Sequence, residues 1–174
     1  MKYFLDFEFE ELENRPTEVI SMAIVREDGK CLYLENRHYD IDECTNDWII
    51  KNVIPYLWLN QWNVEEYMGY ERRWDVIVPL HDFRKKIEEY FSEDDDIEIW
   101  GWYCSYDWYL FCKVFGIMMN LPKSFPYFIR DLRQEMDRIP KEDRPQVKRN
   151  HNALEDARGI RNAYIEVQKI ISQS

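Results

Sequence analysis

Two acidic residues stand at alternate positions near the start of the chain. Asp6 and Glu8 lie in residues 2–10, where apolar and acidic side chains alternate as they do in a β-strand. In a strand both carboxylates project from one face, with Cα atoms roughly 7 Å apart. Two neighbouring carboxylates repel each other, and each raises the pKa of the other unless a cation lies between them. Carboxylate oxygens are ligands that suit Mg²⁺ or Mn²⁺. Taken alone, the pair is more often the polar face of an amphipathic strand.

A second group of candidate residues lies near the C-terminus. Asn152 and Glu155 have the spacing of a capping box, which predicts Asn152 as the N-cap of the last helix. His151 then lies in the loop before this helix and Asp156 in its first turns, so that both can face one site. Each also has a plainer interpretation, because an acid stabilises a helix N-terminus and a loop histidine is common at a surface. Their coincidence with the N-terminal carboxylates favours the functional interpretation.

Asp107 is a third candidate. It falls in the first turn of a helix predicted over 106–115, with Ser105 as N-cap and Gly116 at its end. A strand predicted over 97–103 precedes it, and loops that follow strands of α/β sheets gather ligands. An acid at this place also stabilises a helix without any catalytic role.

The remaining pattern predicts a single α/β domain over residues 1–174, with a mixed sheet flanked by helices. Further strands are expected over 19–26 and 30–34, joined by a hairpin turn at Asp28-Gly29. Residues 59–78 are interpreted as an aromatic insertion with a short helix over 64–70. The other expected helices are 46–57 with Thr45 as its cap, 80–91, 129–138 and 153–171.

Composition restricts the classes of partner. The 174 residues contain no apolar run of 18, so we expect no membrane span, and the acidic N-terminus argues against a secretion signal. Four cysteines without a framework are expected to be reduced thiols of a cytoplasmic protein. The net charge of −11 argues against a broad nucleic-acid surface. Residues 130–161 hold nine basic against seven acidic residues, so a polyanion is expected to approach there, by its end.

The candidate residues resemble the three motifs of the DEDDh family of 3′–5′ exonucleases, namely Asp6-Phe7-Glu8, Asp107 and His151-x4-Asp156. The similarity covers nearly the whole chain in order and is greatest to the small polyadenylate-specific exoribonuclease branch. Residues 59–78 depart from that branch because they are enlarged. The segments that carry the similarity are residues 3–9, 99–102, 105–107, 130–134 and 151–158.

The resemblance implies a ribonuclease H-like fold and a phosphodiester hydrolase. Two divalent cations, Mg²⁺ or Mn²⁺, would be held by Asp6, Glu8, Asp107 and Asp156, with His151 as general base. The substrate would be single-stranded RNA, shortened from its 3′ end to nucleoside 5′-monophosphates. RNA is favoured over DNA by the resemblance alone. It also implies a homodimer, for which residues 59–78 could supply contact area.

Substrate contacts and alternatives remain open at this level. Phosphate contacts are expected from arginines and base stacking from aromatic side chains, although surface solubility and core packing are competing interpretations. A DNA 3′–5′ exonuclease of the same family and an inactive interaction module are the alternative functions; a ribonuclease H-like endonuclease lacks support. The candidate contacts are Phe7, Phe9, Tyr106, Arg130, Arg133 and Arg149.

Overall fold

The structure is a computed structural model that describes residues 1–60 and 75–173. Within these ranges one sheet has the strand order β4-β3-β2-β1-β5-β6. The first three strands are antiparallel neighbours, and the others join in parallel, β5 to β1, β6 to β5 and β4 to β3. The strands are β1 (Lys2–Glu10), β2 (Glu18–Arg26), β3 (Cys31–Asn36), β4 (Ile77–Val78), β5 (Glu98–Gly101) and β6 (Arg130–Asp131).

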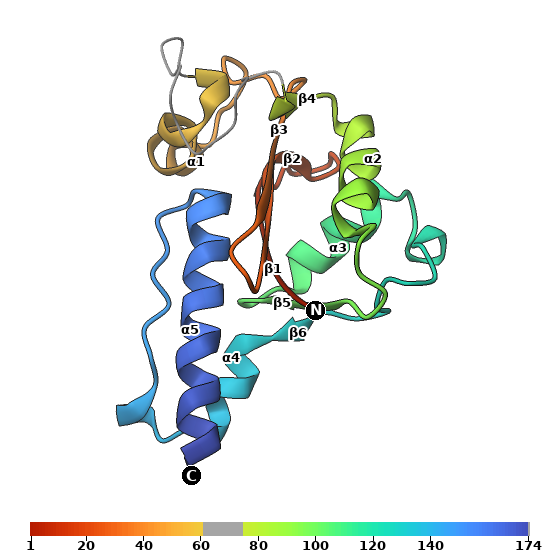
Figure 1. The fold of residues 1–174 in the computed structure, drawn as a ribbon. Helices are drawn as coiled ribbons and strands as arrows, with labels where there is room; N and C mark the ends of the chain where they lie inside the picture. Colours follow the sequence, from red (N-terminus) through yellow and green to blue (C-terminus); the bar gives the residue numbers. More distant parts are fainter. Residues whose placement is uncertain (61–74, 174) are drawn as a thin grey trace.

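Helices cover both faces of this mixed sheet, which gives the predicted α/β, ribonuclease H-like fold. Helix α5 (Ala153–Gln173) lies on one face, and α2 (Leu80–Phe91) and α3 (Ser105–Val114) lie on the other (Figure 1). The period of two in β1 decides which side chains meet which helix. Tyr3, Leu5 and Phe7 pack in the core on the α2–α3 side, while Phe4 packs with α5.

Local patterns predicted several elements well. Helix α2 begins and ends at the predicted residues, because its buried side chains recur every four positions, as at Phe83, Ile87 and Phe91. The Asp28-Gly29 hairpin forms, with Gly29 at a φ of +96°. The capping interaction of α5 is also present, since the Asn152 side chain accepts from the backbone N–H of Glu155 at 3.1 Å.

The helix predicted over 46–57 is wrong in its cap and its length. Helix α1 (Asp47–Asn52) is capped by Asn46, not Thr45, because the Asn46 side chain accepts from the backbone N–H groups of Trp48 and Ile49. Pro55 lacks an N–H and would clash with the preceding turn of a continued α-helix. The chain therefore continues as two 3₁₀-helices, η1 (Ile54–Tyr56) and η2 (Trp58–Asn60).

The helix predicted over 129–138 also begins too early. Arg130 and Asp131 pair with β5 as strand β6, and Asp131 then caps α4 (Leu132–Glu135) by accepting from Arg133 N–H at 2.9 Å. A sequence pattern cannot show this strand, because its hydrogen bonds come from a distant segment. The 3₁₀-helices η4 (Met118–Asn120), η5 (Met136–Arg138) and η6 (Lys141–Asp143) complete the elements in this part of the chain.

Strand β5 is shorter than the prediction of 97–103. It ends at Gly101, where an added Cβ would lie 2.4 Å from the Cβ of Cys104, so the chain turns sharply there. Tyr103 follows with a φ of 51°, in the left-handed region. Helix α3 then begins at Ser105 and ends at Val114, one residue before the predicted bounds, with Cys104 at the N-cap position.

The predicted aromatic insertion is described only at its ends. Residues 59–60 belong to η2, and β4 extends the sheet beside β3. The helix predicted over 64–70 lies outside the described residues. In the described ranges no helix is both long and apolar enough to cross a bilayer. The four cysteines are free thiols.

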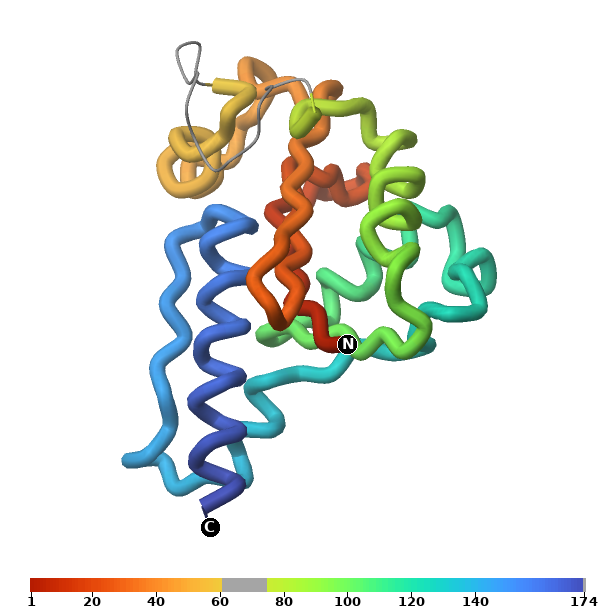
Figure 2. Tube along the Cα trace, in the orientation of Figure 1, coloured from red at the N-terminus to blue at the C-terminus, as the bar shows by residue number. Residues whose placement is uncertain are grey.

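The segment after η6 runs back along α5 to the start of that helix (Figures 1 and 2). Gly159 of α5 permits this close approach, because an added Cβ would lie 2.5 Å from the backbone oxygen of Lys148. The segment that leads into the start of α5 is therefore packed against the helix itself. His151 and Asn152 are the last two residues of this segment before the helix begins.

Gly159→Ala tests this packing. In an ordinary exposed helix position, the change from glycine to alanine stabilises by up to about 1 kcal/mol. Here we expect the opposite sign, a lower melting temperature, because the new methyl group would displace the Lys148 carbonyl. Asn162→Ala, at an exposed position of α5, is the control and should keep or slightly raise the melting temperature, because alanine favours a helix more than asparagine does. A more stable Gly159→Ala protein would show that the segment is not held as described.

Candidate active site

Strand β1 places two carboxylates beyond the end of its parallel neighbour. The last pair between β1 and β5 joins Phe4 to Trp100, and Asp6 and Glu8 follow on the same face of β1 as Phe4. Both remain paired with β2, opposite Ala23 and Ser21. Their exposed fractions are only 1% and 6%, so both carboxylates are buried at the carboxyl end of the parallel strands.

Helix α3 brings the third carboxylate to this place. The sharp turn after β5 leads directly into the helix, and Asp107 lies in its first turn, as predicted. Its carboxylate oxygen Oδ1 accepts from the backbone N–H of Phe7 at 2.8 Å. Asp107 is therefore fixed to the middle of the segment that carries the first two acids.

The start of α5 supplies the fourth carboxylate and the histidine. Asp156 is fully buried and accepts from the backbone N–H groups of Asn150 at 2.8 Å and His151 at 3.3 Å. His151 has a φ of 61°, in the left-handed region, and lies in the loop before the helix as predicted. Ligand atoms of Glu8, His151 and Asp156 all lie within 4.8 Å of one another, close enough to share one metal ion.

Arg149 joins two of the acids. Its Nη2 atom lies 3.2 Å from Oδ1 of Asp6, and its Nε atom lies 3.1 Å from Oδ2 of Asp156. The two carboxylates come from residues 150 positions apart in the chain. Because Arg149 carries a permanent charge on a planar group with several donors, it can satisfy both at once.

The buried acids have raised pKa values. Burial is the main cause for Asp6, whose pKa is raised further by the charges of Asp107 and Glu8. Burial and the charge of Asp156 raise the pKa of Glu8 to about 8, and burial raises that of Asp107 to about 6. The charge of Arg149 acts in the opposite direction on all three groups. The site thus favours either protons or positive charge near these acids.

Two oxygens of this cluster remain open. Within the described residues, Oδ2 of Asp6 and Oε1 of Glu8 are buried and have no hydrogen-bond partner. A buried carboxylate oxygen without a donor is costly, and a hard cation that takes oxygen ligands would satisfy it. The donor set of carboxylates with a nearby imidazole therefore fits a divalent cation such as Mg²⁺ or Mn²⁺.

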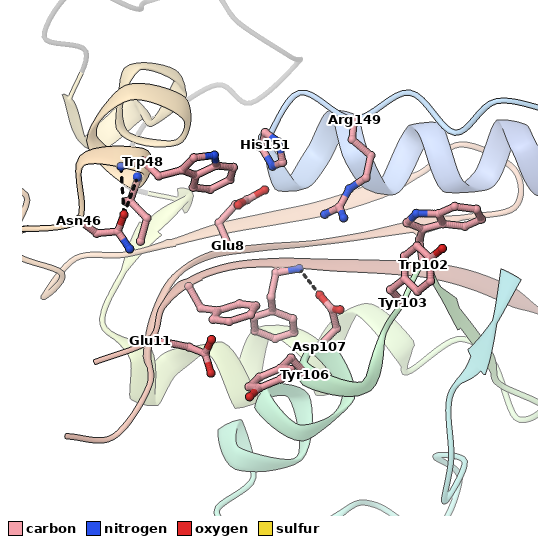
Figure 3. A pocket seen from close by; sticks show the side chains of 13 residues that line it. Glu8, Glu11, Asn46, Trp48, Trp102, Tyr103, Tyr106, Asp107, Arg149 and His151 are labelled. Carbon is pink, nitrogen blue, oxygen red and sulfur yellow. Dashed lines mark hydrogen bonds between the residues drawn. The ribbon is translucent and has the colours of Figure 1, made fainter. Parts of the chain in front are cut away.

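A cleft of about 340 Å³ opens onto these groups (Figure 3). In Figure 3 the Glu8 carboxylate and the His151 ring face each other, and the Trp48 ring lies beside His151. The centroids of these two rings are 4.5 Å apart at 75°. The cleft is lined by Phe7, Glu8, Phe9, Glu11, Asn46, Trp48, Ile49, Trp102, Tyr103, Tyr106, Asp107, Arg149 and His151.

The predicted substrate contacts are distributed unevenly. Phe9 and Tyr106 stack in the cleft wall, with centroids 5.5 Å apart at 11°, whereas Phe7 is 2% exposed and mainly fills the core. Arg149 lines the cleft. Arg130 is not among the described residues that line it, because it pairs with Glu98 at 3.0 Å on the edge of the sheet.

Arg133 is likewise not among the described residues that line the cleft; it pairs with Asp137, and its side chain also bonds to that of Tyr103, which does line the cleft. Trp48, Trp102 and Tyr103 also line the cleft and were not predicted to do so. A signal existed for the last two, since they directly follow the strand that leads to Asp107. No sequence pattern indicated Trp48, because the tertiary fold, and not a neighbouring motif, places α1 beside the cleft.

Taken together, the α/β fold and a cluster of buried carboxylates from β1, α3 and α5 beside a cleft define a ribonuclease H-like protein with a candidate metal site. The family model described as the 3′-5′ exoribonuclease Rv2179c-like domain matches residues 1–168. The chain therefore belongs to the Rv2179c-like 3′-5′ exoribonuclease domain family.

Two curated relatives show the same likeness. They are the 3′-5′ exoribonucleases Rv2179c, from Mycobacterium tuberculosis strain ATCC 25618 / H37Rv, and MT2234.1, from strain CDC 1551 / Oshkosh. Each is 32% identical over 163 residues, which cover 91% of this chain and 88% of the relative. The predicted family of 3′–5′ exoribonucleases is thereby confirmed at this level.

The raised pKa values predict an unusual pH dependence for the metal-free protein. Glu8 binds its proton more tightly in the folded than in the unfolded chain, so its contribution to stability is complete below pH 4.5 and is lost as the pH rises towards 8. Asp107 acts in the same direction between 3.8 and about 6. We expect the melting temperature in chelator to fall over this range.

Thermal unfolding of wild type and Glu8→Gln, scanned from acidic to mildly alkaline pH, measures the effect. The glutamine cannot titrate, so the fall should be shallower in the variant. Parallel curves for the two proteins would show that Glu8 keeps an ordinary pKa.

Proposed function

We propose that this protein is a 3′–5′ exoribonuclease that hydrolyses single-stranded RNA from its 3′ end to nucleoside 5′-monophosphates. The observation that carries the proposal is one cluster of acids and a histidine at the cleft: Glu8, Asp107 and His151 line it, and the buried Asp6 and Asp156 adjoin them through Arg149. Membership of the exoribonuclease domain family and the names of the two curated relatives support the same reaction. The proposal includes the DEDDh class and its small polyadenylate-specific branch.

Two divalent cations, Mg²⁺ or Mn²⁺, would be held by Asp6, Glu8, Asp107 and Asp156. When bound, such cations lower the pKa of water and neutralise charge on the attacking and leaving oxygens of a phosphodiester. The open oxygens of Asp6 and Glu8 support this assignment. The backbone donors on Asp107 and Asp156 hold these two carboxylates in fixed orientations for the same task.

His151 would act as the general base that takes a proton from the attacking water. Its ring is at the cleft, and its backbone is fixed to Asp156, so the imidazole can reach a water near Glu8. An imidazole is the side chain that most often serves as a general base in enzymes. Trp48 contacts the ring edge to face and limits the orientations that it can adopt.

The remaining cleft residues would hold the RNA end. Phe9 and Tyr106 offer stacked rings for a base, and Arg149 offers a guanidinium for a phosphate. The volume of about 340 Å³ lies at the lower end of the range for pockets that bury one small molecule. A cleft of this size suits a chain terminus better than the middle of a long polymer. Contacts from Phe7 and Arg130 remain predictions.

The proposal extends to cellular context. We infer a cytoplasmic protein, RNA rather than DNA as the substrate, and a homodimer. Light scattering at micromolar concentration tests the dimer, and a monomer there would contradict it. Residues 59–78, whose central part lies outside the described residues, remain the proposed insertion.

A time course on 5′-labelled single-stranded RNA with Mg²⁺ or Mn²⁺ tests the reaction. We expect a ladder that shortens from the free 3′ end, no cleavage of circular RNA, and no cleavage in chelator. Matched DNA ranks the two sugars, and Asp156→Asn protein should be inactive because it loses one carboxylate of the site. Metal-independent cleavage, or cleavage of circles, would contradict the proposal; a folded protein that binds RNA without cleaving it would indicate an interaction module.

His151→Ala should lower turnover by roughly 10²–10⁴, the usual contribution of a general base. Its melting temperature should still rise on addition of Mn²⁺, because the four carboxylates remain. Ser92→Ala is the control. Ser92 is exposed at the end of α2 and does not line the cleft, so this variant should keep full turnover. Unchanged turnover in His151→Ala would exclude His151 from proton transfer.

A further inference from the structure

Arg149 occupies an unusual place for a substrate-binding arginine. Its guanidinium lies between Asp6 and Asp156, two acids assigned to metal binding by the proposed function, on which this inference rests. Both carboxylates are almost completely buried, whereas about a third of the Arg149 side chain is exposed. The arginine thus enters the carboxylate cluster from its open side, as a cation from solvent would.

A guanidinium and a divalent cation compete for the same oxygens. Oδ1 of Asp6 and Oδ2 of Asp156 each accept from Arg149, while Oδ2 of Asp6 has no partner among the described residues. A metal ion shared by Asp6 and Asp156 would bring a second positive charge into this small buried volume. Like charges at such a distance repel strongly where solvent is excluded. The two cations therefore exclude each other energetically.

The surroundings give Arg149 space to leave. It lines the cleft on one side and, on the other, a second cavity of about 490 Å³ beside α5. Movement into either space breaks no backbone hydrogen bond, because Asn150 and His151 hold Asp156 through their own N–H groups. The loop can therefore stay in place while the side chain moves. The second cavity is lined by Lys148, Arg149, Asn150, Glu155, Asp156, Arg158, Gly159 and Asn162.

We propose that Arg149 is the resident cation of the metal-free site and is exchanged for a divalent cation when the enzyme is loaded. In the metal-free protein it neutralises Asp6 and Asp156 and keeps the cluster assembled. Loading displaces its guanidinium towards the cleft, where it can contact a substrate phosphate. Arg149 is accordingly a positioning residue for the acids before loading, and it sets the concentration of metal that the enzyme requires.

Calorimetric titration of Mn²⁺ into metal-free protein tests the exchange. Arg149→Gln removes the competing charge, so it should bind Mn²⁺ roughly tenfold more tightly than wild type. Its melting temperature in chelator should be lower, and the rise caused by Mn²⁺ should be larger, because tighter binding stabilises the folded state more. Arg158→Gln is the matched control. Arg158 lines the same second cavity but pairs with Glu155, not with Asp6 or Asp156, so the variant should bind Mn²⁺ like wild type.

Arg149→Lys keeps the charge but cannot present the planar fork that bridges two carboxylates. We expect an affinity between those of wild type and Arg149→Gln, and this variant replaces the glutamine protein if that one fails to fold. If wild type binds Mn²⁺ and the Arg149 variants bind it with equal or weaker affinity, the exchange is overturned. The proposed function would remain intact in that case. No Mn²⁺ binding by wild type or any variant would instead contradict the metal dependence in the proposed function.

Discussion

The mutual repulsion of four buried carboxylates is the constraint around which this structure is built. Asp6, Glu8, Asp107 and Asp156 each have an exposed fraction below 10%, and burial together with their shared charge raises the pKa of three of them. An arrangement of this kind persists only if donors or cations offset the charge. The fold supplies backbone N–H groups to two of the acids and one guanidinium that joins the other side of the cluster.

These compensating groups differ in whether they can leave. The N–H of Phe7 and those of Asn150 and His151 belong to the backbone, so Asp107 and Asp156 keep their orientation whatever enters the site. Among the described residues, the Arg149 side chain is held by its charged contacts with Asp6 and Asp156, and it borders two open spaces. The site thus combines fixed acids with a replaceable cation, which is the division of roles that a loading reaction needs.

Much of this organisation could be predicted because residues that are close in the sequence determine it. The alternation in β1 placed Asp6 and Glu8 on one face, and the capping interaction of Asn152 placed His151 outside α5. Some errors arose where distant contacts decide the structure, as at β6, which forms by pairing with β5. The errors in the cap and length of the helix predicted over 46–57 were different, because the local signals of Asn46 and Pro55 decide that segment. Arg149 was predicted as a phosphate contact, but no local pattern could show its bridge between acids near opposite ends of the chain.

The position of Arg149 depends in turn on a single small residue. Its segment runs back along α5 because Gly159 leaves space for the Lys148 carbonyl, and the next residue along the segment carries the guanidinium into the cluster. A larger residue at 159 would push the Lys148 carbonyl away from α5, and because Arg149 is the next residue, its guanidinium would move relative to Asp6. Backbone packing against α5 therefore decides where the Arg149 guanidinium meets its two carboxylates, and with it how much of the negative charge beside the cleft is offset before any metal binds.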